Sequence, residues 1–223
     1  MFLIVTEPSG RQSDEVHTEL DGQLREMPYR GGWGFGDEKR CLPGTREDFL
    51  EFIASWIENP ESKRELVLLG QAGTGKSTIA NEVARRFDGN YLGSYFAYRR
   101  KEGSKEDAYQ LFTTLVRDLS DRHRAFKREL GRVVKDNSSL RGSRDYLTLF
   151  EHLLEPLRDL QLDNPILIIV DALDESGDAI GRNGLHTFLA KRLFPSKFRV
   201  LYSSPQDRSI RKKVWLPDDH MIE

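Results

Sequence analysis

A single octapeptide constrains the fold of this chain more than any other segment does. It consists of Gly70, Gln71, Ala72, Gly73, Thr74, Gly75, Lys76 and Ser77, and it fits the phosphate-loop pattern G-x-x-x-x-G-K-[ST]. Its glycines allow a tight turn whose N–H groups approach a phosphate without a Cβ in the way. The lysine places a positive charge on the β- and γ-phosphates, and the serine hydroxyl is a ligand for Mg²⁺. The sequence therefore predicts a site for a nucleoside triphosphate.

The segments on either side of this loop match the structural context that the pattern needs. Residues 65–69 have the composition of a buried strand that leads into the loop. Behind the loop, Ile79, Ala80, Val83 and Ala84 form the apolar face of a helix whose N-terminus points its dipole at the phosphates. A glycine-rich surface turn is the alternative interpretation, and the flanking patterns disfavour it. We expect Thr78 to join the loop residues in binding the nucleotide.

Length and composition narrow the class of protein. A chain of 223 residues suits one α/β domain with a substantial core. The formal net charge is -2 with both signs interspersed, so nothing global indicates binding to nucleic acid or to an anionic membrane surface. Cys41 is the only cysteine, which excludes an internal disulfide and a cysteine-based metal cluster and fits the cytoplasm. The apolar start, residues 1–5, is too short to span a bilayer.

Composition also divides the chain into two parts. Residues 1–40 are polar and rich in turn formers, and we expect them to be flexible. Residues 41–223 carry the periodic apolar patterns of one nucleotide-binding domain. The glycine-rich run at 31–36 resembles a phosphate loop only superficially, because no strand precedes it and no helix follows.

Predicted strands and helices alternate along the second part. Besides the helix after the loop, apolar residues at helical spacing predict a helix over 45–58 that Thr45 caps, and others at 108–119, 149–157 and 185–193. Strand-like runs lie at 65–69, 91–98, 166–170, 198–202 and 214–216. The run 166–170 is apolar on both faces, which places it in the middle of a parallel sheet. We predict a P-loop NTPase fold of the α/β class, with a doubly wound, mainly parallel sheet and helices on both faces.

An acidic cluster follows the most strand-like run directly. Asp171 stands where a P-loop protein places the aspartate that holds Mg²⁺, at the end of a strand neighbouring that of the loop. Asp174 and Glu175 lie one turn further on, where a carboxylate orients or deprotonates the attacking water. Alternatively, these two acids cap the next helix or face solvent. We expect Ser77 and Asp171 to hold the metal, and Asp174 and Glu175 to be catalytic.

The two motifs together resemble the NACHT signature of the STAND class of signalling P-loop NTPases. In that signature, as at 171–175, a small residue follows the Mg²⁺ aspartate and two acids come three positions on. The surroundings are similar to NACHT domains of fungal NOD-like receptors and nephrocystin-like proteins. The similar segments are 41–46, 56–57, 73–80 and 111–115, and the resemblance covers about residues 41–217.

This resemblance implies a molecular switch in intracellular signalling or assembly. The ADP-bound form would be closed, and ATP, or GTP in some members, would favour a form competent for oligomerisation through contacts of the γ-phosphate and its Mg²⁺. The partners implied are a second copy of the chain or another signalling protein. The resemblance also implies that residues 43–46 lie near the base or ribose.

The chain departs from the family's pattern in two ways. The strand at 198–202 normally leads into Thr-Ser-Arg-Pro, whose arginine senses the γ-phosphate, but residues 202–205 read Tyr-Ser-Ser-Pro. Ser204 therefore stands in place of the arginine, and a hydroxyl cannot replace a guanidinium fork. The sequence also ends at Glu223 without the winged-helix segment that normally closes over the nucleotide, so we expect a fragment, a short gene product, or parts supplied by another chain.

Three functions stay open from the sequence. The first is a nucleotide switch with slow hydrolysis, and the second is a scaffold that binds nucleotide without turning it over. The third is a small-molecule kinase, which the long segment ahead of Gly70 disfavours because such kinases usually start with their loop. A basic helix face is interpreted as solvated, so nucleic acid is not an expected partner. This face consists of Arg122, Arg124, Lys127, Arg128 and Arg132.

Overall fold

The computed structural model describes residues 22, 29, 40–98, 106–136, 152, 162–175 and 197–204, and the structural statements below concern these residues. Helical segments separate successive strands, as the sequence predicts, although two helices rather than one lie between the second and third strands. In chain order the elements are α2 (Glu47–Glu58), β1 (Glu65–Leu69), α3 (Lys76–Phe87), β2 (Leu92–Ala97), α4 (Glu106–Arg122), α5 (Arg124–Asp136), β3 (Ile166–Asp171), the 3₁₀ helix η3 (Leu173–Glu175) and β4 (Phe198–Ser204).

The four strands form one parallel sheet in the order β1-β4-β3-β2. This confirms the predicted α/β class and the inner position of β3. It also corrects one expectation, because β4 separates β3 from the loop's strand β1, so Asp171 does not end a neighbouring strand. The reason is that β4 is buried along its whole length and therefore needs a partner strand on each side and cover on both faces.

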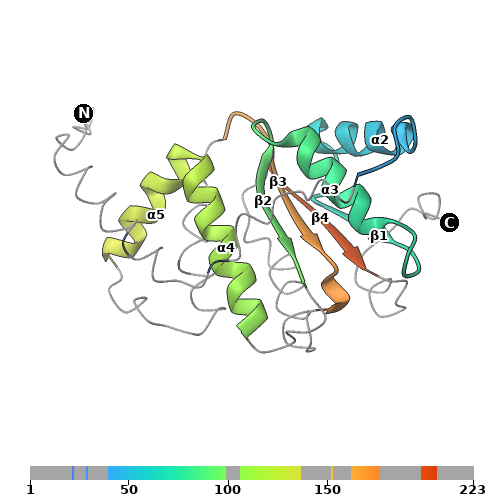
Figure 1. Ribbon diagram of the computed structural model, residues 1–223. Coiled ribbons are helices and arrows are strands. Elements are labelled where there is room, and N and C mark those ends of the chain that lie inside the picture. The colour runs from blue at the N-terminus through green and yellow to red at the C-terminus, as the bar shows by residue number, and fades with distance from the viewer. Residues whose placement is uncertain are drawn as a thin grey trace.

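Helices cover both faces of the sheet, as predicted (Figure 1). Along β3, Ile166, Ile168 and Val170 belong to a core cluster with α4 and α5. The alternate residues Leu167 and Ile169 belong to a second cluster with α2 and α3. This follows from the period of two in a strand, where successive side chains point to opposite faces. Each face therefore has its own core.

The first helix is confirmed, but its predicted cap is wrong. Leu50, Ile53, Trp56 and Ile57 are buried on its inner face, as their spacing predicts. The helix nevertheless begins after Arg46, and no side chain caps it. The hydroxyl of Thr45, the expected cap, donates instead to the carbonyl oxygen of Leu42 in the turn that precedes the helix.

The other predicted elements fall into two groups. The strands at 65–69, 91–98, 166–170 and 198–202 and the helix at 108–119 are confirmed, with ends that differ by a few residues. The helix predicted at 185–193, the strand at 214–216 and all but one residue of the helix at 149–157 lie outside the described residues. In the part of the chain that the structure describes, no helix is both long and apolar enough to cross a membrane.

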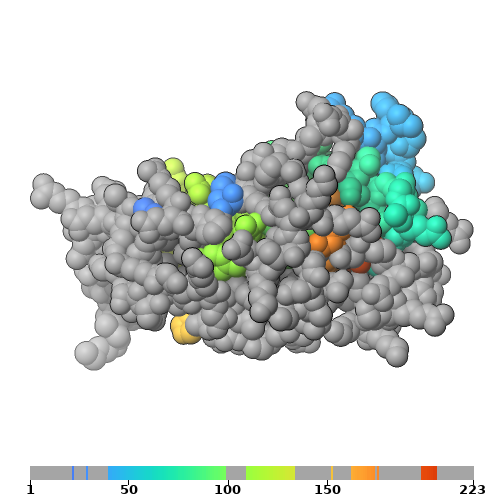
Figure 2. Space-filling model, turned by 60° about the horizontal axis from the view of Figure 1, so that its bottom comes forward, coloured from blue at the N-terminus to red at the C-terminus, as the bar shows by residue number. Residues whose placement is uncertain are grey.

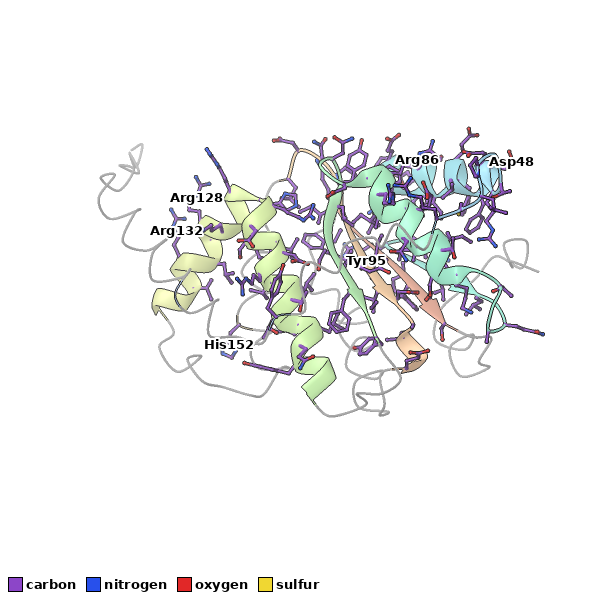
Figure 3. All side chains as sticks on the ribbon, in the orientation of Figure 1. Asp48, Arg86, Tyr95, Arg128, Arg132 and His152 are labelled. Carbon is purple, nitrogen blue, oxygen red and sulfur yellow. The ribbon has the colours of Figure 1, made fainter. Side chains whose placement is uncertain are left out.

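The basic face spreads over the end of α4 and the outer side of α5. Arg128 and Arg132 extend from α5 away from α4 (Figure 3). Arg132 pairs with Glu129 at 3.0 Å, and Arg122 pairs with Asp88 at 2.7 Å. Acidic neighbours on the same surface thus neutralise part of the charge, as the interpretation of a solvated face requires.

Candidate functional site

The phosphate loop connects β1 to α3, and its glycines have the backbone conformation that the motif needs. Gly73 has φ 85° and Gly75 has φ 86°, a left-handed region that favours glycine. Gly75 is also the N-cap residue of α3. Between them, Thr74 closes the loop through its amide and its hydroxyl, which donate to the carbonyl oxygen of Gln71 at 3.3 Å and 2.9 Å. The loop therefore ends at a helix N-terminus, where unpaired N–H groups favour an anion.

Lys76 folds back over the start of this loop. Its ammonium donates hydrogen bonds to the carbonyl oxygens of Gly70 and Gln71, both at 2.9 Å. An ammonium has three N–H donors, so these two bonds leave one for an anion. The lysine charge is thereby held across the loop.

Ser77 and Asp171, the two predicted metal ligands, lie in contact. The Ser77 hydroxyl donates to Oδ1 of Asp171 at 3.1 Å, across 94 residues of sequence. Asp171 is only 2% exposed at the end of β3. Hydroxyl and carboxylate oxygens are hard ligands of the type that Mg²⁺ prefers, and Mg²⁺ usually takes one or two carboxylates, phosphates and water. These residues therefore fit the implied metal.

Two further residues at Asp171 escape prediction from the sequence. The Ser203 hydroxyl, on β4, donates to Oδ1 of Asp171 at 2.5 Å and accepts a hydrogen bond from the amide of Ala172 at 2.9 Å. Tyr95, on β2, lies over the sheet (Figure 3). Burial raises its pKa, and the charge of Asp171 and a hydrogen bond to that carboxylate raise it further. Hydroxyls from the strands on both sides thus hold the carboxylate.

The sequence offers a clue to Ser203 but none to Tyr95. Ser203 is a polar residue at the carboxyl end of a buried strand, where ligands bind in open α/β sheets, and this position could have identified it. Tyr95 stands in an aromatic run that is typical of a strand packed in a core. Nothing in its sequence context distinguishes it from its neighbours.

The remaining acids follow β3 in a sharp turn. Ala172 has φ 55°, and the amide of Glu175 donates to the carbonyl oxygen of Ala172 at 2.8 Å. Both Asp174 and Glu175 therefore lie on η3, at the edge where the strands end. Figure 2 turns this lower edge of Figure 1 toward the viewer, and atoms of the β3–η3 segment reach the surface there in orange. Within the described ranges, no hydrogen bond joins the Glu175 side chain to the loop, so its catalytic role stays a prediction.

Ser204 occupies the position at which the family pattern has an arginine. It is fully buried and pairs in register with Leu69, the last residue before the loop. Its hydroxyl has no hydrogen-bond partner among the residues that the structure describes. The strand β4, which lies between β1 and β3, therefore ends in an uncharged buried serine.

Comparison with known proteins places the chain in a family. A family model described as "Nephrocystin 3, N-terminal" matches residues 44–204, which include the phosphate loop, the acidic cluster and all four strands. No significant match is found among the curated proteins. The match covers well over half of the 223 residues and agrees with the nephrocystin-like resemblance of the sequence. The chain belongs to the nephrocystin-3 N-terminal family.

Proposed function

We propose that this chain binds the Mg²⁺ complex of ATP or GTP and acts as a nucleotide switch in signalling or assembly. The observation that carries this proposal is the contact between Ser77 and Asp171, at 3.1 Å, beside a lysine already bent over the loop. Two segments far apart in sequence meet there, and each supplies the residue type that phosphate and metal binding need. A glycine-rich surface turn would give no reason for that meeting.

The roles of the residues follow from their chemistry. The loop amides and Lys76 would hold the phosphates, and Ser77 and Asp171 would hold the metal, which neutralises phosphate charge when bound. Glu175, with Asp174, would position the attacking water at the same edge of the sheet. Slow hydrolysis would then let the nucleotide state, rather than turnover, carry the signal.

Ser204 favours a second candidate, a nucleotide-gated scaffold without hydrolysis. A buried serine with no partner in the described part of the chain supplies neither charge nor donors in a fork geometry to a γ-phosphate. Removal of one such stabilising group commonly costs about 10²–10³ in rate. The two candidates share the binding step and differ in turnover.

The binding step is tested by titrating the chain with Mg²⁺ and ATP, GTP or ADP. Lys76→Ala should abolish triphosphate binding, because it removes the ammonium that lies over the loop. Lys127→Ala, on α5, is the matched control and should bind as the wild type does. Retained micromolar affinity in Lys76→Ala would refute the P-loop assignment.

Phosphate release in the same samples separates the two candidates. Slow release that disappears in Glu175→Gln, with binding intact, supports the hydrolysing switch. Binding without any release supports the scaffold. Asp171→Asn reports on the metal, and we expect its nucleotide affinity to lose most of its dependence on Mg²⁺.

A further inference from the structure

A tight turn ahead of α2 determines where Arg46 lies. The amide and the hydroxyl of Thr45 donate to the same acceptor, the carbonyl oxygen of Leu42, at 3.0 Å and 2.6 Å. Pro43 and Gly44 occupy the centre of this turn, and Gly44 has φ 75°. Proline followed by a residue with positive φ is the requirement of a type II turn. The doubled hydrogen bond makes the turn a rigid support for the next residue.

Arg46 itself adopts an unfavourable backbone conformation. Its φ of 62° and ψ of 20° are left-handed, although it carries a Cβ. Such residues cost free energy and persist where the surrounding structure requires them, often at functional sites. Arg46 is the N-cap residue of α2, and its carbonyl oxygen accepts from the amide of Leu50 at 3.0 Å. An N-cap residue ordinarily has β-region angles, so the start of the helix does not require the left-handed conformation.

The side chain of Arg46 explains it, because the guanidinium lies against the phosphate loop. One terminal nitrogen, Nη2, donates to the carbonyl oxygen of Thr74 at 2.9 Å, and Nη1 donates to that of Gly75 at 3.4 Å. A Cβ at Gly75 would stand 2.7 Å from both nitrogens. The absence of a side chain at Gly75 therefore lets the guanidinium approach the loop backbone closely.

These two carbonyls belong to the peptide units whose amides are expected to bind phosphate. In a trans peptide the C=O and the following N–H point in opposite directions. Arg46 holds the carbonyl of Thr74 on its own side, and it shares the carbonyl of Gly75 with the amide of Ile79, which donates to it at 3.0 Å. The amides of Gly75 and Lys76 are therefore turned to the other side. At a phosphate loop those amides cradle the anion.

We propose that Arg46 is a positioning residue of the phosphate loop, whose planar fork orients the amides of Gly75 and Lys76 toward the phosphates. This inference rests on the proposed binding of nucleotide. It predicts that the geometry of the fork matters and not its charge alone. A lysine would keep the charge, but it cannot place two donors in one plane on two carbonyls.

The test compares Arg46→Ala and Arg46→Lys with the wild type and with a matched control, Arg86→Ala. Arg86 is an exposed arginine in the last turn of α3, the helix that follows the phosphate loop, and it forms an ion pair with Glu47 at 3.9 Å. Arg46 is exposed as well, so its removal opens no cavity in the core and all variants should fold. The probes are Mg²⁺ with inorganic pyrophosphate and Mg²⁺ with ADP. Amide hydrogen exchange of residues 74–77 is measured in the nucleotide-free protein.

We expect Arg46→Ala to weaken both probes equally, by about tenfold, with an unchanged melting temperature and faster exchange of the Gly75 and Lys76 amides. Arg46→Lys should recover little of the affinity, and Arg86→Ala should match the wild type. Full recovery by lysine, or a loss for ADP but not for pyrophosphate, would overturn the inference. Wild-type binding of neither probe would refute the proposed function. The exchange measurement would still decide whether Arg46 holds the loop, and unchanged exchange in Arg46→Ala would show that it does not.

Discussion

Replacement of Ser203 by alanine is the sharpest test of how the Asp171 carboxylate is held. The Ser203 hydroxyl makes two hydrogen bonds at once: it donates to Asp171 at 2.5 Å and accepts from the amide of Ala172 at 2.9 Å. That amide belongs to a residue with φ 55°, so the serine also supports the turn that follows β3. Alanine would remove both bonds without adding bulk.

The magnitude follows from these two bonds. A hydrogen bond to a charged group contributes about 1.5–3 kcal/mol, and leaving a buried amide without a partner costs about 1–3 kcal/mol. Ala172 is partly exposed, so water can reach its amide and the second cost falls at the low end. We expect a loss of about 3 kcal/mol in the free energy of unfolding. For a domain of this size that corresponds to a fall in Tm of roughly 6–12 °C.

The chain provides a matched control at the next position. Ser204 lies on the same strand and is equally buried, but its hydroxyl has no partner in the described part of the chain. Ser204→Ala should therefore be neutral or slightly stabilising, because it removes a buried polar group that is not hydrogen-bonded. Thermal unfolding of both variants, followed by circular dichroism, measures the difference. Equal losses in the two variants, or no loss in Ser203→Ala, would refute the reasoning.

Two further predictions concern the core and its dependence on pH. Gly93→Ala would place a Cβ 2.4 Å from Ile166 Cγ2 and 2.9 Å from Leu119 Cδ2, so we expect a loss of about 1–3 kcal/mol by overpacking, measured by urea unfolding. Burial, and then the charge of Arg122, lower the pKa of His123 below its ordinary 6.5, so the folded state favours the neutral ring. The stability that this contributes is present above pH 6.5 and is lost as the pH falls through the lowered pKa, so His123→Gln should show a smaller decrease in Tm between about pH 7.5 and 5.5 than the wild type shows.

The sequence predicts the elements well where a pattern has a single physical interpretation. The run 166–170 is apolar on both faces, and only a strand inside a parallel sheet that is covered on each side buries both faces at once. The turn before α3 is equally well predicted, because Gly73 and Gly75 adopt the positive φ angles for which the pattern needs glycine. Both predictions depend on local chemistry alone.

Prediction fails where one group has two possible local partners, and where residues distant in sequence meet. Thr45 is a residue type that often caps helices, but its hydroxyl donates to the carbonyl oxygen of Leu42 instead. Tyr95 and Ser203 meet Asp171 only because β3 lies between their strands, and a strand order is not visible in a period of two. The apolar run predicts the position of Asp171 at the end of β3, but it does not predict that β4, rather than β3, lies beside β1.

The insertion of β4 between β1 and β3 also has a consequence for how the chain folds. Until residues 198–204 are available, β1 has no partner among the strands that the structure describes, and β2 and β3 form a separate parallel pair. The pairing of β4 with β1 closes a loop of well over a hundred residues, and contacts of such high separation are slow to form. We therefore expect the phosphate loop and Asp171 to come together in a late step of folding. A chain that stops before Phe198 would expose two unpaired apolar strand edges and would tend to aggregate.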